Sequence, residues 1–374
     1  MNRQLTSCLG SLLAVLMLTP AGCAQAPRAS DAPAAPPALQ SAAPPTPETL
    51  DQRKAALLKE CGEGFEVRET GHWLIVHKAD QKWVDSAARM LERTHDLYFE
   101  QFGKAGFEPR PLAQKLVCVL IGKQEDFARY LDALRQATGR PPPTEPQPAG
   151  QEPRARQAPV GLGSYSGQTN RIQLCDIHSI PRNPNRPVSD ARLDLENVAR
   201  ISHEAAHQLS FNTGLLKPQT GYPMWLGEGL AANFEFTDAD KPFGPLTANL
   251  SPRAGRLRQL FAEGQIASIK SMVTLSPSAS RQPDNKGPTY VQGWGLFRFL
   301  ITERPKQLKQ YLADLAARPR SPRNAAEALA AFEAAFGPVD DIEKDWQQFF
   351  KRLGPPGAGQ PAPASPPDQP PAGP

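Results

Sequence analysis

Proline is concentrated in three stretches of this chain, and it limits which parts can form regular structure. The chain has 374 residues, of which 41 are proline. The proline-rich stretches run from Ala26 to Glu48, from Arg140 to Arg156 and from Gly354 to Pro374. Such segments bury too little apolar surface to offset the entropy lost on ordering. We therefore expect a disordered tether over residues 24–50, an exposed loop in the middle and a disordered tail over residues 354–374. Residues 51–353 remain for one large domain or two packed lobes.

The N-terminus has the layout of an export signal over residues 1–23. Arg3 precedes an apolar run from Leu9 to Leu18, which is shorter than the about 20 residues that span a bilayer. Ala21, Gly22 and Cys23 resemble the end of a bacterial lipobox, although Pro20 stands where an aliphatic residue is usual. We expect an exported protein of the bacterial cell envelope, anchored by a lipid on Cys23. Secretion with cleavage nearby and an uncleaved anchor are the alternatives. The net charge of +4 gives no case for nucleic acid as a partner.

The body of the chain first alternates between strand and helix patterns and then becomes helical. Buried-strand patterns alternate with amphipathic-helix patterns before residue 200, and helix patterns dominate after it. We expect an α+β fold: a small mixed β-sheet lobe over residues 51–200, active-site helices over 191–236 and a mostly helical lobe over 250–353. The expected strands are His72–His77, Lys115–Ile121 and Asn170–Ile177, and the expected helices are Trp83–Phe102, Glu125–Ala137, Thr289–Leu300, Pro305–Ala317, Ala325–Phe336 and Ile342–Leu353.

The run from His203 to His207 is the strongest functional signal. Histidines four apart on a helix lie on one face, where two imidazoles can bind one Zn²⁺ at about 2.0–2.1 Å. Glu204 between them can reach water at the metal. Glu228 lies among apolar residues in a second predicted helix that begins near Pro223. A carboxylate in such surroundings is costly unless it is paired or bound to metal.

These segments resemble the gluzincin class of zinc metallopeptidases. The resemblance rests on Ile201–Leu209, Asn212–Leu215 and Pro223–Ala231, and it extends to an uncharacterised, peptidase-like bacterial family often found in exported proteins. It implies a zincin-like fold in which His203, His207 and Glu228 hold one zinc ion and Glu204 is the general base. It also implies that an edge strand, either near Gly163–Gly167 or the strand after it, borders the cleft and pairs with an extended peptide. Ala232 departs from the family, because many gluzincins place an acid there to orient a ligand histidine.

The expected function is therefore zinc-dependent hydrolysis of peptide bonds in a peptide or protein substrate. Tyr290 begins a predicted helix after a run of residues 276–288, and its phenol could stabilise the oxyanion; the alternative is a half-buried packing residue. The sequence is also compatible with two other interpretations of the site. One is a non-catalytic envelope binding or scaffold protein that keeps a metallopeptidase fold and its zinc. The other is a structural zinc site, which would need a fourth protein ligand.

Overall fold

The computed structural model describes residues 48–139, 163–182, 187–218, 220–235, 252–276, 288–318 and 324–352. The expected signal sequence, nearly all of the tether, the middle proline-rich loop and the tail lie outside these ranges. Helix α1 (Leu50–Cys61) begins at the last residue of the expected tether, with Thr49 as its N-cap. Within the described ranges every helix is too short or too polar to cross a bilayer.

The described strands form one mixed five-stranded sheet in the order β1-β2-β3-β5-β4. Strands β2 (Trp73–Lys78), β3 (Leu116–Ile121) and β5 (Arg171–Cys175) are parallel, and they lie where the sequence predicts strands. The flanking strands β1 (Glu66–Glu69) and β4 (Gly163–Ser166) are antiparallel to their neighbours. Strands β2 and β3 contain the apolar runs Trp73–Val76 and Leu116–Ile121, because both faces of the sheet are covered.

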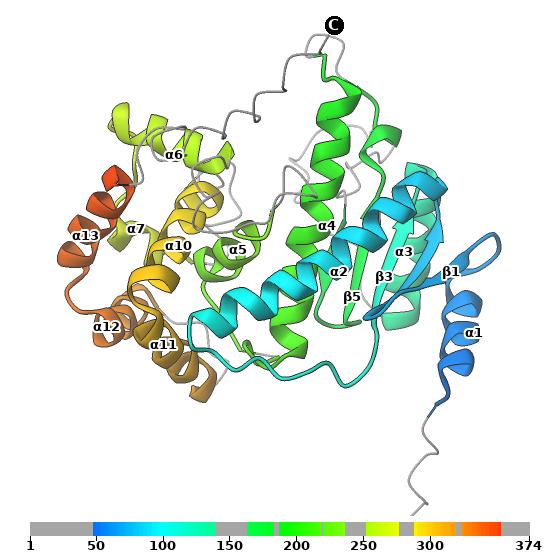
Figure 1. The fold of residues 1–374 in the computed structure, drawn as a ribbon, viewed down its shortest axis with the longest axis horizontal. Coiled ribbons are helices and arrows are strands. Elements are labelled where there is room, and N and C mark those ends of the chain that lie inside the picture. The colour runs from blue at the N-terminus through cyan, green and yellow to red at the C-terminus, as the bar shows by residue number, and fades with distance from the viewer. Residues whose placement is uncertain are drawn as a thin grey trace, which may run out of the picture. The chain divides into compact units, whose positions relative to one another are not determined.

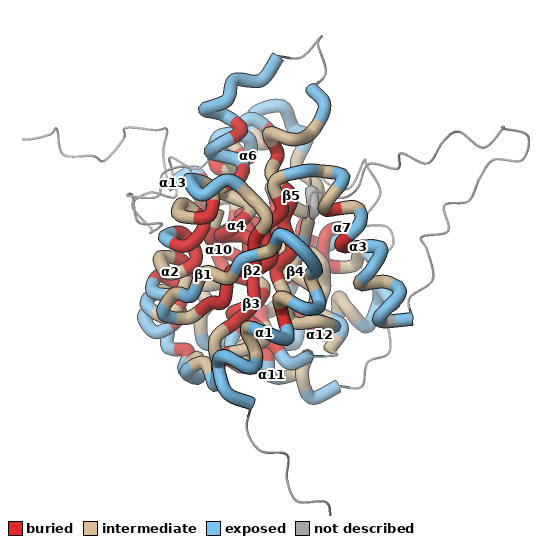
Figure 2. Tube along the Cα trace, turned by 90° about the vertical axis from the view of Figure 1, so that its right-hand side faces the viewer, coloured by how far each residue is buried: buried red, intermediate tan, exposed pale blue. Residues whose placement is uncertain are grey.

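The two faces of the sheet pack against different helices (Figure 1). Trp73 and Ile75 of β2 belong to the larger core, which includes residues of α2 (Gln81–Lys104) and α4 (Asp190–Asn212). The alternate residues Leu74 and Val76 pack in a smaller core with residues of α1 and of α3 (Gln124–Thr138). Figure 2 shows buried residues running through β2, β3, β5 and α4. The second half of α4, from Ile201 on, therefore lies inside the protein, against the sheet.

The C-terminal part of the described chain is helical, so the predicted α+β class is confirmed. Several element ends differ from prediction by a few residues, and in two places the type of structure also changes: the expected strand Asn170–Ile177 stops at Cys175 before a short 3-10 helix, and the expected helix over Thr289–Leu300 opens with a π-helical turn. The helical elements are α5 (Met224–Ala232), α6 (Pro252–Ala262), α7 (Ile269–Val273), the π-helical turn η3 (Pro288–Gln292), α10 (Gly293–Glu303), α11 (Pro305–Ala317), α12 (Ala325–Phe336) and α13 (Val339–Arg352).

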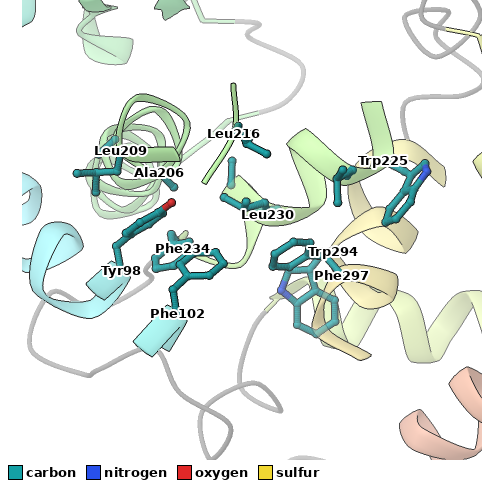
Figure 3. Close-up of a cluster of buried hydrophobic side chains, with 14 of the residues drawn as sticks. Tyr98, Phe102, Ala206, Leu209, Leu216, Trp225, Leu230, Phe234, Trp294 and Phe297 are labelled. Carbon is teal, nitrogen blue, oxygen red and sulfur yellow. The ribbon is translucent and has the colours of Figure 1, made fainter. Parts of the chain in front are cut away.

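Helix α5 joins the two parts of the fold. In Figure 3 Leu230 of α5 lies between the α4 side chains Leu209 and Ala206 and the α10 side chains Trp294 and Phe297, and Trp225 lies at the other end of α5, away from α4. All of these side chains are at most 2 % exposed. Because α4 packs on the sheet and α10 belongs to the helical part, residues on α5 are placed at the junction of the two.

Candidate metal centre

Helix α4 is fixed at its start and along its buried side. Ser189 caps the helix by accepting a hydrogen bond from a backbone N–H of the first turn. The buried Gln208 side chain accepts a hydrogen bond from the Trp73 indole (2.9 Å) and donates to the carbonyls of Val117 (3.0 Å) and Asn170 (2.8 Å). A fully bonded buried amide holds its element in a single register. The face of α4 that carries the histidines is therefore rigidly placed relative to the sheet.

His203 and His207 lie on one face of α4, as the four-residue spacing predicts, and their ring centroids are 4.9 Å apart. Glu228 of α5 faces both rings. Its carboxylate oxygens are 3.2 Å from Nε2 of His203 and 3.8 Å from Nε2 of His207. One ligating atom from each of the three residues lies within 4.8 Å of the others, so this group could hold a metal ion.

The three donors fit zinc in type, and the two separations from Glu228 also fit it in spacing. Imidazole nitrogen and carboxylate oxygen are common zinc ligands, and tetrahedral ligands at about 2.0–2.1 Å from zinc are roughly 3.3 Å from each other. The measured separations of 3.2 and 3.8 Å bracket that spacing. The group found among the described residues has three members. A catalytic zinc site uses three protein ligands and leaves one position for water or substrate.

The charges of the site also favour a cation. Burial acts to lower the pKa of His203, but hydrogen bonds to Glu228 and Glu235 outweigh it and raise the pKa to about 10. Burial acts to raise the pKa of Glu228, yet His203 and His207 bring it well below its usual range. The carboxylates of Glu228 and Glu235 therefore place negative charge next to the two imidazoles. Because the site is largely buried, this charge would strongly stabilise a divalent cation.

Helix α5 brings Glu228 close to α4 because its surroundings leave little freedom. Trp225, Leu226 and Leu230 are buried, which confirms the apolar neighbours expected of this carboxylate. Gly229 lets α10 approach closely: a Cβ at that position would lie 2.7 Å from the carbonyl carbon of Gly293. Packing therefore fixes the rotation of α5 about its axis, and in this orientation Glu228 points toward the two histidines.

Glu204, the predicted base, lies half-buried on the same turn as the histidines and outside the ligand group. One oxygen of its carboxylate, Oε2, accepts a hydrogen bond of 2.6 Å from the backbone N–H of Tyr165. Tyr165 belongs to β4, the strand at the edge of the described sheet next to β5. The carboxylate is thus fixed through one oxygen, which leaves the other oxygen for proton transfer.

Tyr290, the predicted oxyanion donor, lies next to the ligand group. Its ring centroid is 6.5 Å from that of His203. Burial, with the negative charges of Glu228 and Glu204, raises the pKa of this phenol to about 12. The hydroxyl therefore keeps its proton at neutral pH and can act as a hydrogen-bond donor. Its role in catalysis stays a prediction.

Two further residues contact the site and were not predicted from the sequence. Glu235, just after α5, accepts a hydrogen bond of 2.9 Å from Nδ1 of His203, and Arg253 of α6 forms an ion pair with Glu235. Glu235 lies three residues beyond the end of α5, so helical spacing from Glu228 does not indicate it; the only local signal is an acid shortly after the predicted ligand helix. Arg253 offered no such signal, because residues 236–251 separate it from Glu235.

Comparison with known proteins covers the segment that carries this site. Residues 197–321 match a family described as a protein of unknown function (DUF1570). The matched segment contains the His203–His207 run, Glu228, Glu235, Arg253 and Tyr290. No curated protein matches the chain. The match is consistent with an uncharacterised family and assigns no activity.

Proposed function

We propose that the protein is a zinc-dependent peptidase of the gluzincin type, with a zincin-like fold. One observation carries the proposal: His203, His207 and Glu228 converge from two helices while Glu204 lies beside them, outside the ligand group. A purely structural metal site has no use for a carboxylate in that position. When bound, zinc would act as a Lewis acid and lower the pKa of water to about 7.

The chain's own groups have the following roles in this proposal. Glu204 takes a proton from the attacking water, whose oxygen forms the new bond to the substrate carbonyl carbon. Glu204 then gives that proton to the amide nitrogen as the carbon–nitrogen bond breaks, so that one water and one amide yield a carboxylic acid and an amine. The Tyr290 phenol donates a hydrogen bond to the oxyanion of the tetrahedral intermediate.

The proposed substrate is a peptide or protein segment in extended conformation. Its support is the position of β4, which lies at the sheet edge with Tyr165 directly against Glu204. A peptide pairing with this edge would run past the base, as in sheet augmentation. We further propose that the enzyme acts in the bacterial cell envelope after export, with Cys23 as the site of a lipid anchor.

Glu204→Gln tests the proposal most directly. The amide oxygen can still accept the hydrogen bond from Tyr165, so we expect an intact fold and the same bound zinc. Loss of the base should slow peptide cleavage by about 10²–10⁴-fold. The measurements are zinc content by elemental analysis and digestion of casein or a peptide library, with and without a chelator. Glu196→Gln is the matched control, because this exposed glutamate lies two turns earlier on α4.

The possible results separate the competing functions. Zinc without cleavage in the wild-type protein would support the non-catalytic scaffold. Cleavage that survives chelation, or full activity of Glu204→Gln, would contradict the mechanism. A purified wild-type protein that binds no zinc would contradict the site itself.

A further inference from the structure

The two ring nitrogens of His203 have different carboxylate partners. Nδ1 is 2.9 Å from Oε1 of Glu235, and Nε2 is 3.2 Å from Oε2 of Glu228. An ionised carboxylate can only accept, so a hydrogen bond to Glu235 requires a proton on Nδ1. In the neutral imidazole this leaves the lone pair on Nε2, the nitrogen that faces Glu228. The contact with Glu235 therefore selects the tautomer that can bind a metal.

Glu235 is itself held by a guanidinium group. Arg253 donates from Nε to Oε2 (2.7 Å) and from Nη2 to Oε1 (2.5 Å), and both side chains are about four-fifths buried, with 22 % and 21 % exposed. Two parallel bonds of this kind fix the plane of the carboxylate as well as its position. The guanidinium carbon also lies 5.9 Å from the ring centroid of Tyr290. Arg253 therefore contacts both Glu235 and the ring of Tyr290.

The backbone before Glu235 is anchored independently. Phe234 is 3 % exposed and packs on Tyr98 and Phe102 of α2, with ring centroids 5.5 and 6.1 Å away. Figure 3 shows Phe234 pointing into this aromatic group. Asn233 donates to the carbonyls of Gly229 (2.6 Å) and Trp294 (3.1 Å) and so ties the end of α5 to α10. The residue that follows these anchors has little freedom to move away from His203.

We propose that Glu235 positions His203 for metal binding and that Arg253 acts through Glu235. In many gluzincins an acid one turn after the ligand glutamate orients a ligand histidine. Ala232 stands at that position here, and the pair of Glu235 and Arg253 takes over this role. The inference rests on the proposed function, since it assumes that His203 is a zinc ligand. Neither residue is proposed to touch substrate or metal.

Zinc affinity provides the test, measured by competition with a chromophoric chelator. Glu235→Ala should weaken zinc binding by about 10–100-fold, as is typical when the outer partner of a ligand histidine is lost. Glu235→Gln should keep affinity within a few-fold of wild type, because its amide oxygen still accepts from Nδ1. Arg253→Ala should also weaken binding, although Arg253 does not contact His203 in the described contacts. The double variant Glu235→Ala/Arg253→Ala should bind no more weakly than Glu235→Ala alone, since Arg253 has no target once Glu235 is removed.

Two further measurements separate positioning from general stability. The absorption spectrum of the Co²⁺-substituted protein reports ligand geometry, and it should change in Glu235→Ala and stay close to wild type in Glu235→Gln. Asp345→Ala is the matched control, because it removes an ion pair with Arg304 of 2.8 Å between helical elements outside the ligand group. This control should leave both zinc affinity and the spectrum unchanged.

The inference is overturned if wild type binds zinc and Glu235→Ala binds it equally well with the same cobalt spectrum. It is also overturned if Glu235→Gln loses as much affinity as Glu235→Ala, or if the two single losses add in the double variant. A wild-type protein without measurable zinc affinity would overturn the proposed function, and this inference with it. Zinc binding by wild type therefore distinguishes failure of the pair from failure of the site.

Discussion

At the scale of single residues, two glycines on either side of Glu228 have opposite surroundings. A Cβ on Gly229 would lie 2.7 Å from the carbonyl carbon of Gly293 and 3.2 Å from Cβ of Phe297, whereas one on Gly227 would meet nothing within 4 Å. Backbone atoms cannot move aside as a flexible side chain can. The close contact of α5 with α10 thus depends on Gly229, and through it the position of Glu228.

Gly229→Ala should lower the free energy of unfolding by about 1–3 kcal/mol, the usual cost of forcing a methyl group into a packed interior. Gly227→Ala should raise it by about 0.5–1 kcal/mol, because alanine loses less conformational entropy than glycine in a helix. Urea unfolding in the presence of chelator measures both, so that metal binding does not contribute. Equal effects of the two substitutions would contradict the close approach of α5 and α10.

At the scale of elements, the sequence predicted the bounds of helices correctly where residues at the helix ends mark them. Helices α11 and α12 have the predicted bounds, because Pro305 opens one and Asn324 and Glu327 form a capping box at the start of the other. Strand β1 (Glu66–Glu69) and helix α6 (Pro252–Ala262) were not predicted. The first is a short polar strand at the sheet edge, and the second contains a glycine and three arginines.

The same distinction applies to the candidate site. His203, Glu204 and His207 share one helical turn, and Glu228 stands out as a charge among apolar residues, so local patterns reveal them. The ion pair of Glu235 with Arg253 depends on how α5 and α6 pack in three dimensions. No periodicity in the sequence encodes that contact, and it required the structure.

One link between elements should depend on pH. Glu92 of α2 accepts hydrogen bonds from the hydroxyl of Thr70 (2.6 Å) and from N (2.8 Å) and Nδ1 (2.6 Å) of His72, in the segment that joins β1 and β2. Burial acts to raise the pKa of Glu92, but these bonds outweigh it and bring the pKa below its ordinary value of 4.5. A carboxylate whose pKa is lower in the folded state stabilises the fold above the unfolded-state pKa. That contribution is lost as the pH falls through the folded-state pKa.

Wild type should therefore exceed Glu92→Gln in free energy of unfolding by about 1–2 kcal/mol at about pH 5, and the difference should shrink toward about pH 3. Urea titrations at several pH values provide the measurement. Glu100→Gln on the same helix is the control: Glu100 is paired with Lys104 at the exposed surface, so solvent screening makes its effect smaller. A difference between wild type and Glu92→Gln that stays constant down to about pH 3 would contradict the assignment.

At the scale of the whole described fold, the candidate metal centre lies where the sheet part and the helical part meet. His203 and His207 come from α4, which Gln208 fastens to the sheet, and Glu228 comes from α5, which packs on α10. An unfolded chain does not bring these three donors together. A metal that binds only the folded state stabilises it by mass action. Zinc bound at this site should therefore couple the two parts of the fold.

Zinc at 100 times its dissociation constant should raise the free energy of unfolding by about 2.7 kcal/mol, which corresponds to an increase in Tm of roughly 5–10 °C. Differential scanning fluorimetry with increasing zinc gives this shift. Mg²⁺ at the same concentrations should have no comparable effect, because it prefers a shell of oxygen ligands and this group offers two nitrogens. His203→Ala/His207→Ala should keep the fold and lose the response to zinc. An equal shift in that double variant would place the zinc elsewhere on the protein, and the junction of α4 and α5 would then not be its site.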